Sequence, residues 1–233
     1  MPLSTVGKIG FIGGGNMAEA FIKGLMSGGF PVEDIHFFEP NETRRDLMLE
    51  RYGITCSENN AALVAESDII VLATKPQILD KVLNEVNGSF SDAKLLISIL
   101  AGITTMTLEA GLGEQARVVR SMPNTPALAG RGAAALCPGS NMTEEDKRVA
   151  QHLFETVGIA LWVEEGQMDA VTGLSGSGPA FVYTFIEALT AGGVQEGLRL
   201  DIAHALAVQT VVGAAHLVQV TGEHPALLRE KVC

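Results

Sequence analysis

The sequence predicts an α/β fold in which a Rossmann-type, mostly parallel sheet domain is followed by an all-helical domain. Three observations support this prediction. Short apolar runs alternate with helix-like segments through the first two thirds of the chain. A glycine-rich segment directly follows the first apolar run. Strand signals end after Glu164, and long apolar segments of helical character take their place.

The strands of the predicted sheet are short apolar runs of the length that buried strands have. The first five are residues 6–12, 35–38, 69–73, 95–100 and 118–122. Helical periodicity with polar faces separates several of them, at 17–27, 42–52 and 78–86. We therefore expect βαβ units and a parallel sheet.

Two further apolar runs, residues 133–137 and 159–163, extend the same sheet in this prediction. A helix between them is predicted to open at Thr143. The next three residues are acidic, which suits the positive end of a helix dipole.

The second part of the chain reads as two buried helices, at residues 171–198 and 202–220. Both are apolar almost all the way round, so each must be covered on every side. About seventy residues cannot cover them, and we infer that another subunit does. The sequence thus predicts a dinucleotide-binding domain at 1–164 and an all-helical dimerisation domain at 165–233.

Composition excludes several classes of protein. The 233 residues are 47% hydrophobic and carry a formal net charge of −11, which excludes a disordered chain and disfavours nucleic-acid binding. The uncharged segment 202–221 has the length of a membrane span, but its His and Gln side chains favour a helix buried against protein. We expect no membrane partner.

The three cysteines are far apart and show no metal-ligand spacing, which predicts reduced thiols and no metal site. The N-terminus has no signal-peptide features, so we expect a cytoplasmic protein.

The strongest local motif is the segment from Gly10 to Ala18, which reads GFIGGGNMA. Gly13, Gly15 and Ala18 occupy the three small-residue positions of the dinucleotide fingerprint. Gly13 permits the tight turn, Gly15 lets the backbone approach a pyrophosphate, and Ala18 lets the helix pack closely. This pattern predicts a bound dinucleotide cofactor.

The choice between NAD and NADP stays open at this level. Glu39 ends the second strand, where an acidic side chain often holds the ribose hydroxyls of NAD. Arg44 and Arg45 follow, where they can either meet a 2′-phosphate or form a solvated helix face, and Asn60 is a further polar candidate near the adenosine.

Other candidate clusters stand at the carboxyl ends of strands, where ligands of open α/β sheets bind. They are residues 74–76, 101–102 and 122–126. The segment 173–179, GLSGSGP, places small residues in an apolar helical region. It reads either as a ligand-binding loop with Pro179 opening the next helix, or as a helix kink with packing glycines.

The second domain lacks an evident general base. No lysine occurs between Lys147 and Lys231, and His204 and His216 read as core histidines. His224 reads as a helix-start residue. Alcohol oxidation needs such a base, whereas a protonated imine chiefly needs to be held against the nicotinamide. This favours reduction of a C=N bond.

Several motifs together closely resemble the pyrroline-5-carboxylate reductase family. They are IGFIGGGNMA, the Lys75-Pro76 pair, RSMPNTPA from Arg120, GLSGSGPAF from Gly173, FIEAL from Phe185 and GEHP from Gly222. They run in order along the whole chain. The resemblance implies reduction of 1-pyrroline-5-carboxylate to L-proline with NADPH, or NADH, as the last step of proline biosynthesis.

The resemblance also implies site residues and a homodimer or higher homo-oligomer formed through interleaved helical domains. Glu223, beside the substrate nitrogen, and Lys75 would be catalytic, and Ser175, Gly176, Ser177 and Glu223 would contact the substrate. The cofactor residues that it implies are Gly13, Gly14, Gly15, Asn16, Met17, Asn60, Thr74, Lys75, Pro76, Ala101 and Asn124.

One departure concerns the end of the chain. In the family, the segment similar to Glu230–Cys233 is followed by a Ser-Pro-Gly-Gly-Thr-Thr loop and further helix, so we expect a C-terminally incomplete helical domain. The alternatives to the reductase are another two-domain NADP-dependent dehydrogenase, of the hydroxyacid type, and a non-catalytic dinucleotide sensor.

Overall fold

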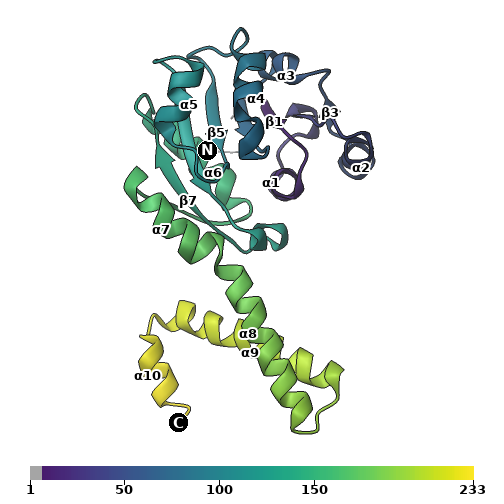
Figure 1. The fold of residues 1–233 in the computed structure, drawn as a ribbon, viewed down its shortest axis with the longest axis vertical. Coiled ribbons are helices and arrows are strands. Elements are labelled where there is room, and N and C mark those ends of the chain that lie inside the picture. The colour runs from purple at the N-terminus through teal and green to yellow at the C-terminus, as the bar shows by residue number, and fades with distance from the viewer. Residues whose placement is uncertain (1–6) are drawn as a thin grey trace. The chain divides into compact units, whose positions relative to one another are not determined.

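The computed structural model describes residues 7–233, so Val6 of the first predicted strand lies outside the described residues. The chain divides into two compact units. We call the part up to Ser177 the sheet unit and the part Gly178–Cys233 the helical unit, and each is described by itself (Figure 1).

The sheet unit is built on one eight-stranded sheet with the order β3-β2-β1-β4-β5-β6-β7-β8. All neighbouring pairs are parallel except β6 and β7. The strands are β1 (Ile9–Ile12), β2 (Ile35–Phe38), β3 (Thr55–Cys56), β4 (Ile69–Leu72), β5 (Leu95–Ser98), β6 (Arg117–Met122), β7 (Gly132–Pro138) and β8 (Gly158–Trp162).

The α-helices of this unit connect the strands. They are α1 (Asn16–Ser27), α2 (Glu42–Tyr52), α3 (Asn60–Glu66), α4 (Leu79–Val86), α5 (Thr105–Leu112), α6 (Glu144–Glu155) and α7 (Met168–Val171). Short 3₁₀ turns lie at η2 (Val32–Asp34), η3 (Pro76–Ile78), η4 (Thr125–Ala129) and η5 (Glu165–Gln167), and a π-helical turn at η6 (Thr172–Gly176).

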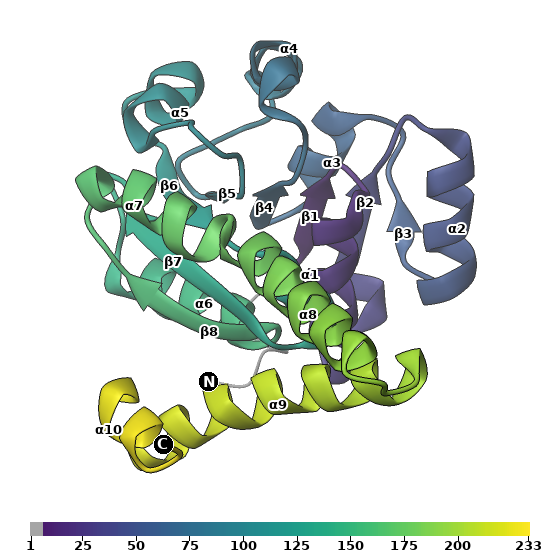
Figure 2. The same cartoon turned by 60° about the horizontal axis from the view of Figure 1, so that its bottom comes forward.

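Alternate residues of each central strand face opposite layers of helices. In β4, Ile69 and Val71 join the core cluster that contains Phe21 and Phe154, whereas Ile70 and Leu72 join the other large cluster. The rings of Phe21 on α1 and Phe154 on α6 meet edge to face at 4.8 Å. Figure 2 shows α4 and α5 on one side of the sheet and α1 and α6 on the other. Burial on both faces explains why the strand sequences are continuously apolar.

The predicted α/β fold with its mostly parallel sheet is confirmed. Each expected apolar run contributes a strand, and Thr143 forms a capping box with Asp146 at the start of α6. The antiparallel pair arises because β6 and β7 are joined by a short connection around η4, which leaves no room for a crossover.

Residues 165–177 belong with the sheet unit by packing, although the sequence places them in the helical domain. Met168 of α7 is buried against Ala135 and Cys137 of β7. The change from strands to helices at Glu164 is correct, but the first helical turns cover the sheet before the chain enters the helical unit.

The segment around Gly176 is helical, which differs from the expected ligand loop. Residues Thr172–Gly176 form the π-helical turn, and α8 begins at Gly178, so Pro179 is its second residue. A Cβ on Gly176 would lie 2.6 Å from Cε of Met122. That atom is the flexible end of the Met122 side chain, which can move aside. The helical backbone here agrees with the kink that the sequence left as the alternative.

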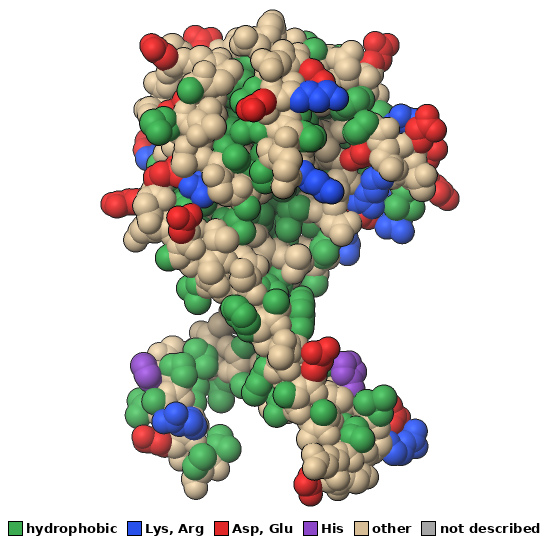
Figure 3. All heavy atoms as spheres, in the orientation of Figure 1, with side chains coloured by type: hydrophobic (Ala, Val, Ile, Leu, Met, Phe, Trp, Pro, Cys, Tyr) green, Lys and Arg blue, Asp and Glu red, His purple; other side chains and the backbone are tan. Residues whose placement is uncertain are grey.

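The helical unit contains α8 (Gly178–Gln195), α9 (Leu200–Thr221) and α10 (Pro225–Glu230). Apolar side chains are exposed along both long helices, as the green atoms of this unit show in Figure 3. His204 and His216 are also exposed in the single chain, so the expected core histidines are not buried within it. Too little of the chain surrounds α9 to cover it.

Candidate cofactor site

The glycine loop joins β1 to α1 and crosses the carboxyl end of β4. Gly13 has φ +100°, and its N–H donates to the carbonyl of Phe38 at 2.9 Å. A Cβ on Gly13 would lie 2.7 Å from the carbonyl oxygen of Ala73. Only glycine fits here, because the backbone angle and the neighbouring carbonyl both exclude a side chain.

Gly15 serves a different purpose. Its φ of −66° and ψ of 178° suit any residue, and a Cβ there would meet no protein atom within 4 Å. Gly15 precedes α1, and no side chain caps this helix. The N–H groups of the first turn, including those of Asn16 and Met17, are therefore available to an anion.

A cavity of about 600 Å³ opens beside this loop, at the carboxyl ends of β1, β2 and β4. It lies wholly within the sheet unit. Its lining residues are Ile12, Gly13, Gly15, Asn16, Met17, Phe38, Glu39, Pro40, Asn59, Asn60, Ala73, Thr74, Lys75, Ile78, Lys81, Val82, Glu85 and Ile99.

Two buried polar atoms of this lining have no hydrogen-bond partner among the described residues. They are Oδ1 of Asn60 and Oγ1 of Thr74. Nδ2 of Asn60 donates to Glu85 at 2.7 Å, which fixes the orientation of the amide. Buried polar groups are normally satisfied. The two atoms, the uncapped helix and the open space at Gly15 together fit a polar, phosphate-bearing dinucleotide.

Both carboxylate oxygens of Glu39 accept hydrogen bonds from backbone N–H groups. Oε2 accepts from the N–H of Gly14 and Oε1 from the N–H of Asn41, both at 2.9 Å. The side chain thereby ties the end of β2 to the glycine loop. Each oxygen keeps a lone pair for a further donor, so these two bonds do not decide between NAD and NADP.

Seven of the predicted cofactor residues line the cavity: Gly13, Gly15, Asn16, Met17, Asn60, Thr74 and Lys75. Four do not, namely Gly14, Pro76, Ala101 and Asn124. Gly14 lies in the glycine loop, Pro76 begins η3 and Ala101 follows β5.

Asn124 connects two predicted segments of the site. Its Nδ2 donates to the carbonyl of Ser175 at 3.0 Å, and its Oδ1 accepts from the N–H of Ala133 at 2.9 Å. The loop after β6 therefore holds the π-helical turn that contains Ser175 and Gly176. Oγ of Ser175 donates to the carbonyl of Val171 at 3.1 Å, so this hydroxyl is used within the helix.

Glu223 lies in the helical unit, between α9 and α10. Its carboxylate pairs with Nζ of Lys231 at 2.5 Å. His224 caps α10, because its Nδ1 accepts from the N–H of Ala226 at 3.2 Å. The prediction of a helix-start histidine is confirmed.

A part-buried ion pair between β6 and η5 was not predicted. Arg120 of β6 is 5% exposed and pairs with Glu165 of η5. Glu165 also accepts from the N–H and Oγ1 of Thr105 at 3.2 and 2.8 Å. Burial alone would raise the pKa of Glu165, but hydrogen bonds from Arg120 and Thr105 outweigh it and lower this pKa.

Cys137 borders the same ion pair. Burial, together with the nearby Glu165 carboxylate, raises the pKa of the Cys137 thiol to about 11. The thiol therefore stays protonated at neutral pH and is a poor nucleophile.

Other residues of the cavity were missed by sequence reasoning. Phe38, Ile78, Val82 and Ile99 give it apolar walls, and Lys81 and Glu85 lie at one side. Only the strand-end position of Phe38 and Ile99 carries a signal in the sequence, because ligands bind at that edge of a parallel sheet.

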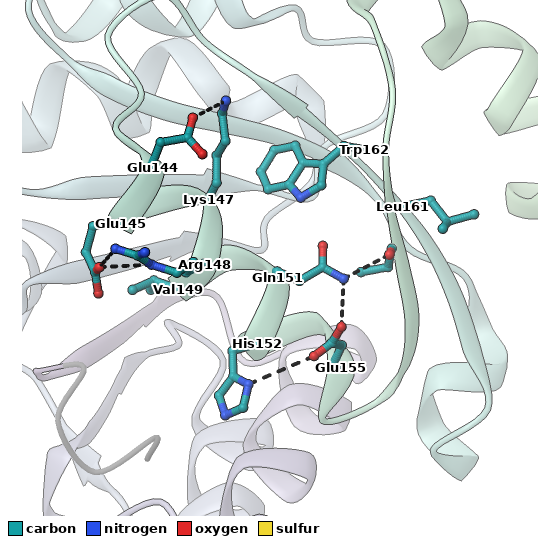
Figure 4. Close-up of a pocket in the computed structure, with 11 residues that line it drawn as sticks. Glu144, Glu145, Lys147, Arg148, Val149, Gln151, His152, Glu155, Leu161 and Trp162 are labelled. Atoms are coloured by element: carbon teal, nitrogen blue, oxygen red, sulfur yellow. Dashed lines mark hydrogen bonds and ion pairs between the residues drawn. The ribbon is translucent and has the colours of Figure 1, made fainter. Parts of the chain in front are cut away.

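A second cavity, of about 630 Å³, lies between α6 and β8 (Figure 4). Glu144 pairs with Lys147 and Glu145 with Arg148, and Nδ1 of His152 lies 3.9 Å from Glu155. Gln151 donates to Glu155 and to the carbonyl of Ala160. Oε1 of Gln151 has no partner among the described residues, but no glycine loop lines this cavity and Thr143 already caps the N-terminus of α6. The cavity therefore offers no open helix N-terminus to a pyrophosphate, and it is not the candidate cofactor site.

No group of metal-ligating side chains is found in residues 7–233. Within the same range, one helix, α9, is long and apolar enough to cross a membrane by length and composition alone.

Two family models match parts of this chain. A family model described as pyrroline-5-carboxylate reductase dimerisation matches residues 165–233, and one described as NADP oxidoreductase, coenzyme F420-dependent, matches residues 8–102. The second match covers the glycine loop and every residue that lines the cavity. The sheet unit is thus an NADP-binding domain, and the dimerisation domain implies a homo-oligomer.

Full-length relatives match along nearly the whole chain. The pyrroline-5-carboxylate reductase of Methanosarcina acetivorans is 45% identical over 97% of this chain and 84% of its own length. Among solved structures, the pyrroline-5-carboxylate reductase of Coxiella burnetii has a TM-score of 0.91 and 34% identity over 98% of this chain and 85% of that one.

A third relative was solved with its cofactor. The pyrroline carboxylate reductase of Plasmodium falciparum, with NADP bound, has a TM-score of 0.87 and 32% identity over 97% of this chain and 84% of that one. Identity at this level over this length shows the family: the chain belongs to the pyrroline-5-carboxylate reductases.

Proposed function

We propose that this protein reduces 1-pyrroline-5-carboxylate to L-proline with NADPH, as the last step of proline biosynthesis. NADPH supplies the hydride when bound. Family membership supports the reaction, and the cavity beside the glycine loop is the observation that carries the cofactor assignment.

On the cofactor side, residues Gly13–Met17 hold the pyrophosphate and Asn60 contacts the adenosine end. The uncapped N-terminus of α1 supports the first role, because its N–H groups attract an anion. The partnerless Oδ1 of Asn60 supports the second. Thr74, Lys75, Pro76, Ala101 and Asn124 extend along the cofactor in this proposal, which takes NADPH as the cofactor and keeps NADH as a possible second one.

On the substrate side, Ser175, Gly176, Ser177 and Glu223 contact 1-pyrroline-5-carboxylate. A carboxylate beside the ring nitrogen favours the protonated imine, which is the more electrophilic form. Glu223 must then leave Lys231, its partner within the helical unit. Lys75 adds a positive charge that attracts anionic groups of the substrate or cofactor.

Residues 165–233 form the dimerisation and substrate domain in this proposal. They assemble the chain into a homodimer or a larger homo-oligomer, and the enzyme works in the cytoplasm. The exposed apolar faces of α8 and α9 support the assembly, because a lone chain leaves them in water.

The proposal is tested by following NADPH oxidation with 1-pyrroline-5-carboxylate and then with a panel of oxo acids. We expect turnover of the imine alone. Turnover only of an oxo acid would favour a hydroxyacid-type dehydrogenase, and NADPH binding without any turnover would favour a sensor.

The role of Glu223 is tested by Glu223→Gln, with Glu230→Gln as a control for charge loss in the same unit. We expect the KM for the imine to rise roughly ten-fold in the first variant only, because a charged hydrogen bond is lost. NADP⁺ affinity should not change in either. An unchanged KM would leave Glu223 a structural residue paired with Lys231.

A further inference from the structure

Arg44 of α2 reaches across to the glycine loop. Its Nε donates to the carbonyl oxygen of Gly14 at 2.5 Å, although thirty positions separate the two residues. One terminal nitrogen donates to Oε2 of Glu19 on α1 at 2.6 Å. The guanidinium thus joins the loop, α1 and α2, and its side chain is 21% exposed.

This contact fixes the direction of the peptide between Gly14 and Gly15. No described peptide bond is cis. In a trans peptide the C=O and the following N–H point in opposite directions. Because Arg44 holds the Gly14 carbonyl, the Gly15 N–H is directed away from Arg44. Glu39 holds the Gly14 N–H at 2.9 Å, so both polar groups of Gly14 are restrained by side chains.

Glu19 holds Arg44 in turn. Its other oxygen accepts from Arg51 at 2.9 Å and from the hydroxyl of Tyr52 at 2.7 Å. Burial alone would raise the pKa of Glu19, but the hydrogen bonds from Tyr52, Arg44 and Arg51 outweigh it and lower this pKa. Glu19 is therefore ionised at neutral pH and compensates the charge of Arg44.

Arg45 is placed differently on the same helix. Its nearest acidic partners, Glu42 and Asp46, lie at 4.0 and 3.8 Å. Among the described residues it forms no hydrogen bond or ion pair with the glycine loop, so it provides a matched comparison for loss of one arginine from α2.

We propose that Arg44 is a positioning residue that holds the Gly14–Gly15 peptide for the pyrophosphate, and that it does not read the 2′-phosphate. The inference rests on the proposed function, since it assumes that the pyrophosphate binds at this loop. The pyrophosphate is common to NADP and NAD. Loss of Arg44 therefore weakens both cofactors by the same factor.

The test is calorimetric titration of NADP⁺ and NAD⁺ into the wild type, Arg44→Gln, Glu19→Gln and Arg45→Gln. For the first two variants we expect both dissociation constants to rise roughly ten-fold, with their ratio unchanged. Arg45→Gln should leave NAD⁺ affinity at the wild-type value. Melting temperatures are recorded to confirm that each variant folds.

Two further readouts separate positioning from general stability. In the cofactor-free protein, deuterium uptake by the segment Gly13–Met17 should rise in Arg44→Gln and not in Arg45→Gln. In turnover assays, the KM values for NADPH and NADH should rise together while kcat changes less than two-fold. Arg44→Lys should restore part of the affinity, since it keeps one donor and the charge.

Three results would overturn the inference. Selective loss of NADP⁺ affinity in Arg44→Gln would assign Arg44 to the 2′-phosphate. Unchanged affinity of Arg44→Gln for both cofactors would show that the glycine loop keeps its conformation without Arg44. Equal loss of NAD⁺ affinity in Arg45→Gln would indicate a general charge effect. Failure of the wild type to bind NADP⁺ would instead contradict the proposed function.

Discussion

Positions 13 and 15 both require glycine, but for different physical reasons. Gly13 has a left-handed backbone conformation, and the carbonyl oxygen of Ala73 occupies the space that a side chain would need. The requirement for glycine at this position therefore comes from the folded protein itself. Gly15 has an ordinary backbone and open space around it, so its constraint comes from the ligand. The motif in the sequence marks both positions alike.

Alanine at the two positions should therefore separate stability from binding. Gly13→Ala should lower the free energy of unfolding by about 2 kcal/mol, from backbone strain and the clash with Ala73. Gly15→Ala should be as stable as the wild type or slightly more so. Its dissociation constant for NADP⁺ should nevertheless rise at least about ten-fold.

Urea unfolding without cofactor and calorimetric titration measure the two effects. Wild-type affinity in Gly15→Ala would show that the pyrophosphate does not approach this residue. Unchanged stability in Gly13→Ala would show that the loop can relax around a side chain.

At the residue scale, the sequence predicted the glycine loop and the polar strand ends of the cavity, because fingerprint spacing and strand-end position are local signals. It left Glu39 and Arg44 ambiguous. Their roles depend on contacts with Gly14, which is 25 and 30 positions away. The sequence alone does not tell whether a charged side chain near the end of the second strand contacts solvent, a ribose or the backbone of the glycine loop.

At the scale of elements, the pair between Arg120 and Glu165 anchors η5 to β6. Thr105 brings the start of α5 to the same carboxylate. The anchored turn leads directly into α7 and the π-helical turn, which Asn124 also holds. These contacts attach the last segment of the sheet unit before the chain continues into α8.

Glu165→Gln should lower the free energy of unfolding at pH 7 by about 2 kcal/mol, because it leaves the buried Arg120 charge without its counter-ion. Folding lowers the pKa of Glu165 below its ordinary value of 4.5. The stabilisation is therefore fully present above about pH 4.5 and is lost as the pH falls through the folded-state pKa. The difference from wild type should shrink over that range.

Urea titrations between pH 7 and pH 3 measure this difference. The control is Glu114→Gln, which removes an exposed carboxylate of the same unit and should change stability by less than about 0.5 kcal/mol. A difference that stays constant down to the lowest pH would mean that altered packing, not the lost charge, destabilises Glu165→Gln.

The elements that the sequence missed are short ones. β3 has two residues and α3 has seven, too few for a periodic pattern to stand out. α5 has eight residues, as the predicted α4 has, but it buries only Leu108 where α4 buries four residues, so its apolar periodicity is weak. Long elements with a clear start signal, such as α6 with Thr143, were predicted well. The π-helical turn was left between two interpretations because small residues favour loops and close helix packing equally.

At the scale of the whole molecule, the helical unit cannot bury its own apolar surface. Phe181, Tyr183 and Phe185 on α8 are 55–69% exposed in the single chain. Only Ala203 and Ala207 of α9 are buried within the described residues. The sequence predicted this deficit from helices that are apolar on every side, and the dimerisation match explains it.

Phe185→Glu should therefore break the assembly. A carboxylate in an apolar interface loses its hydration, which costs more than such an interface can recover. We expect light scattering to give a mass of at least two 24.5 kDa chains for the wild type and of one chain for the variant. Leu49→Glu, the same type of change on α2 of the sheet unit, should leave the mass unchanged.

The same variant tests whether the cofactor site is complete in one chain. Every residue that lines the cavity belongs to the sheet unit. The monomeric Phe185→Glu variant should therefore bind NADP⁺ with a dissociation constant within about three-fold of the wild-type value by calorimetry. Its rate of 1-pyrroline-5-carboxylate reduction should fall sharply if the substrate site needs the assembled helical domains. Lost NADP⁺ binding in a folded monomer would show that a second subunit completes the cofactor site. A light-scattering mass of Phe185→Glu equal to that of the wild type would place the interface away from this face of α8.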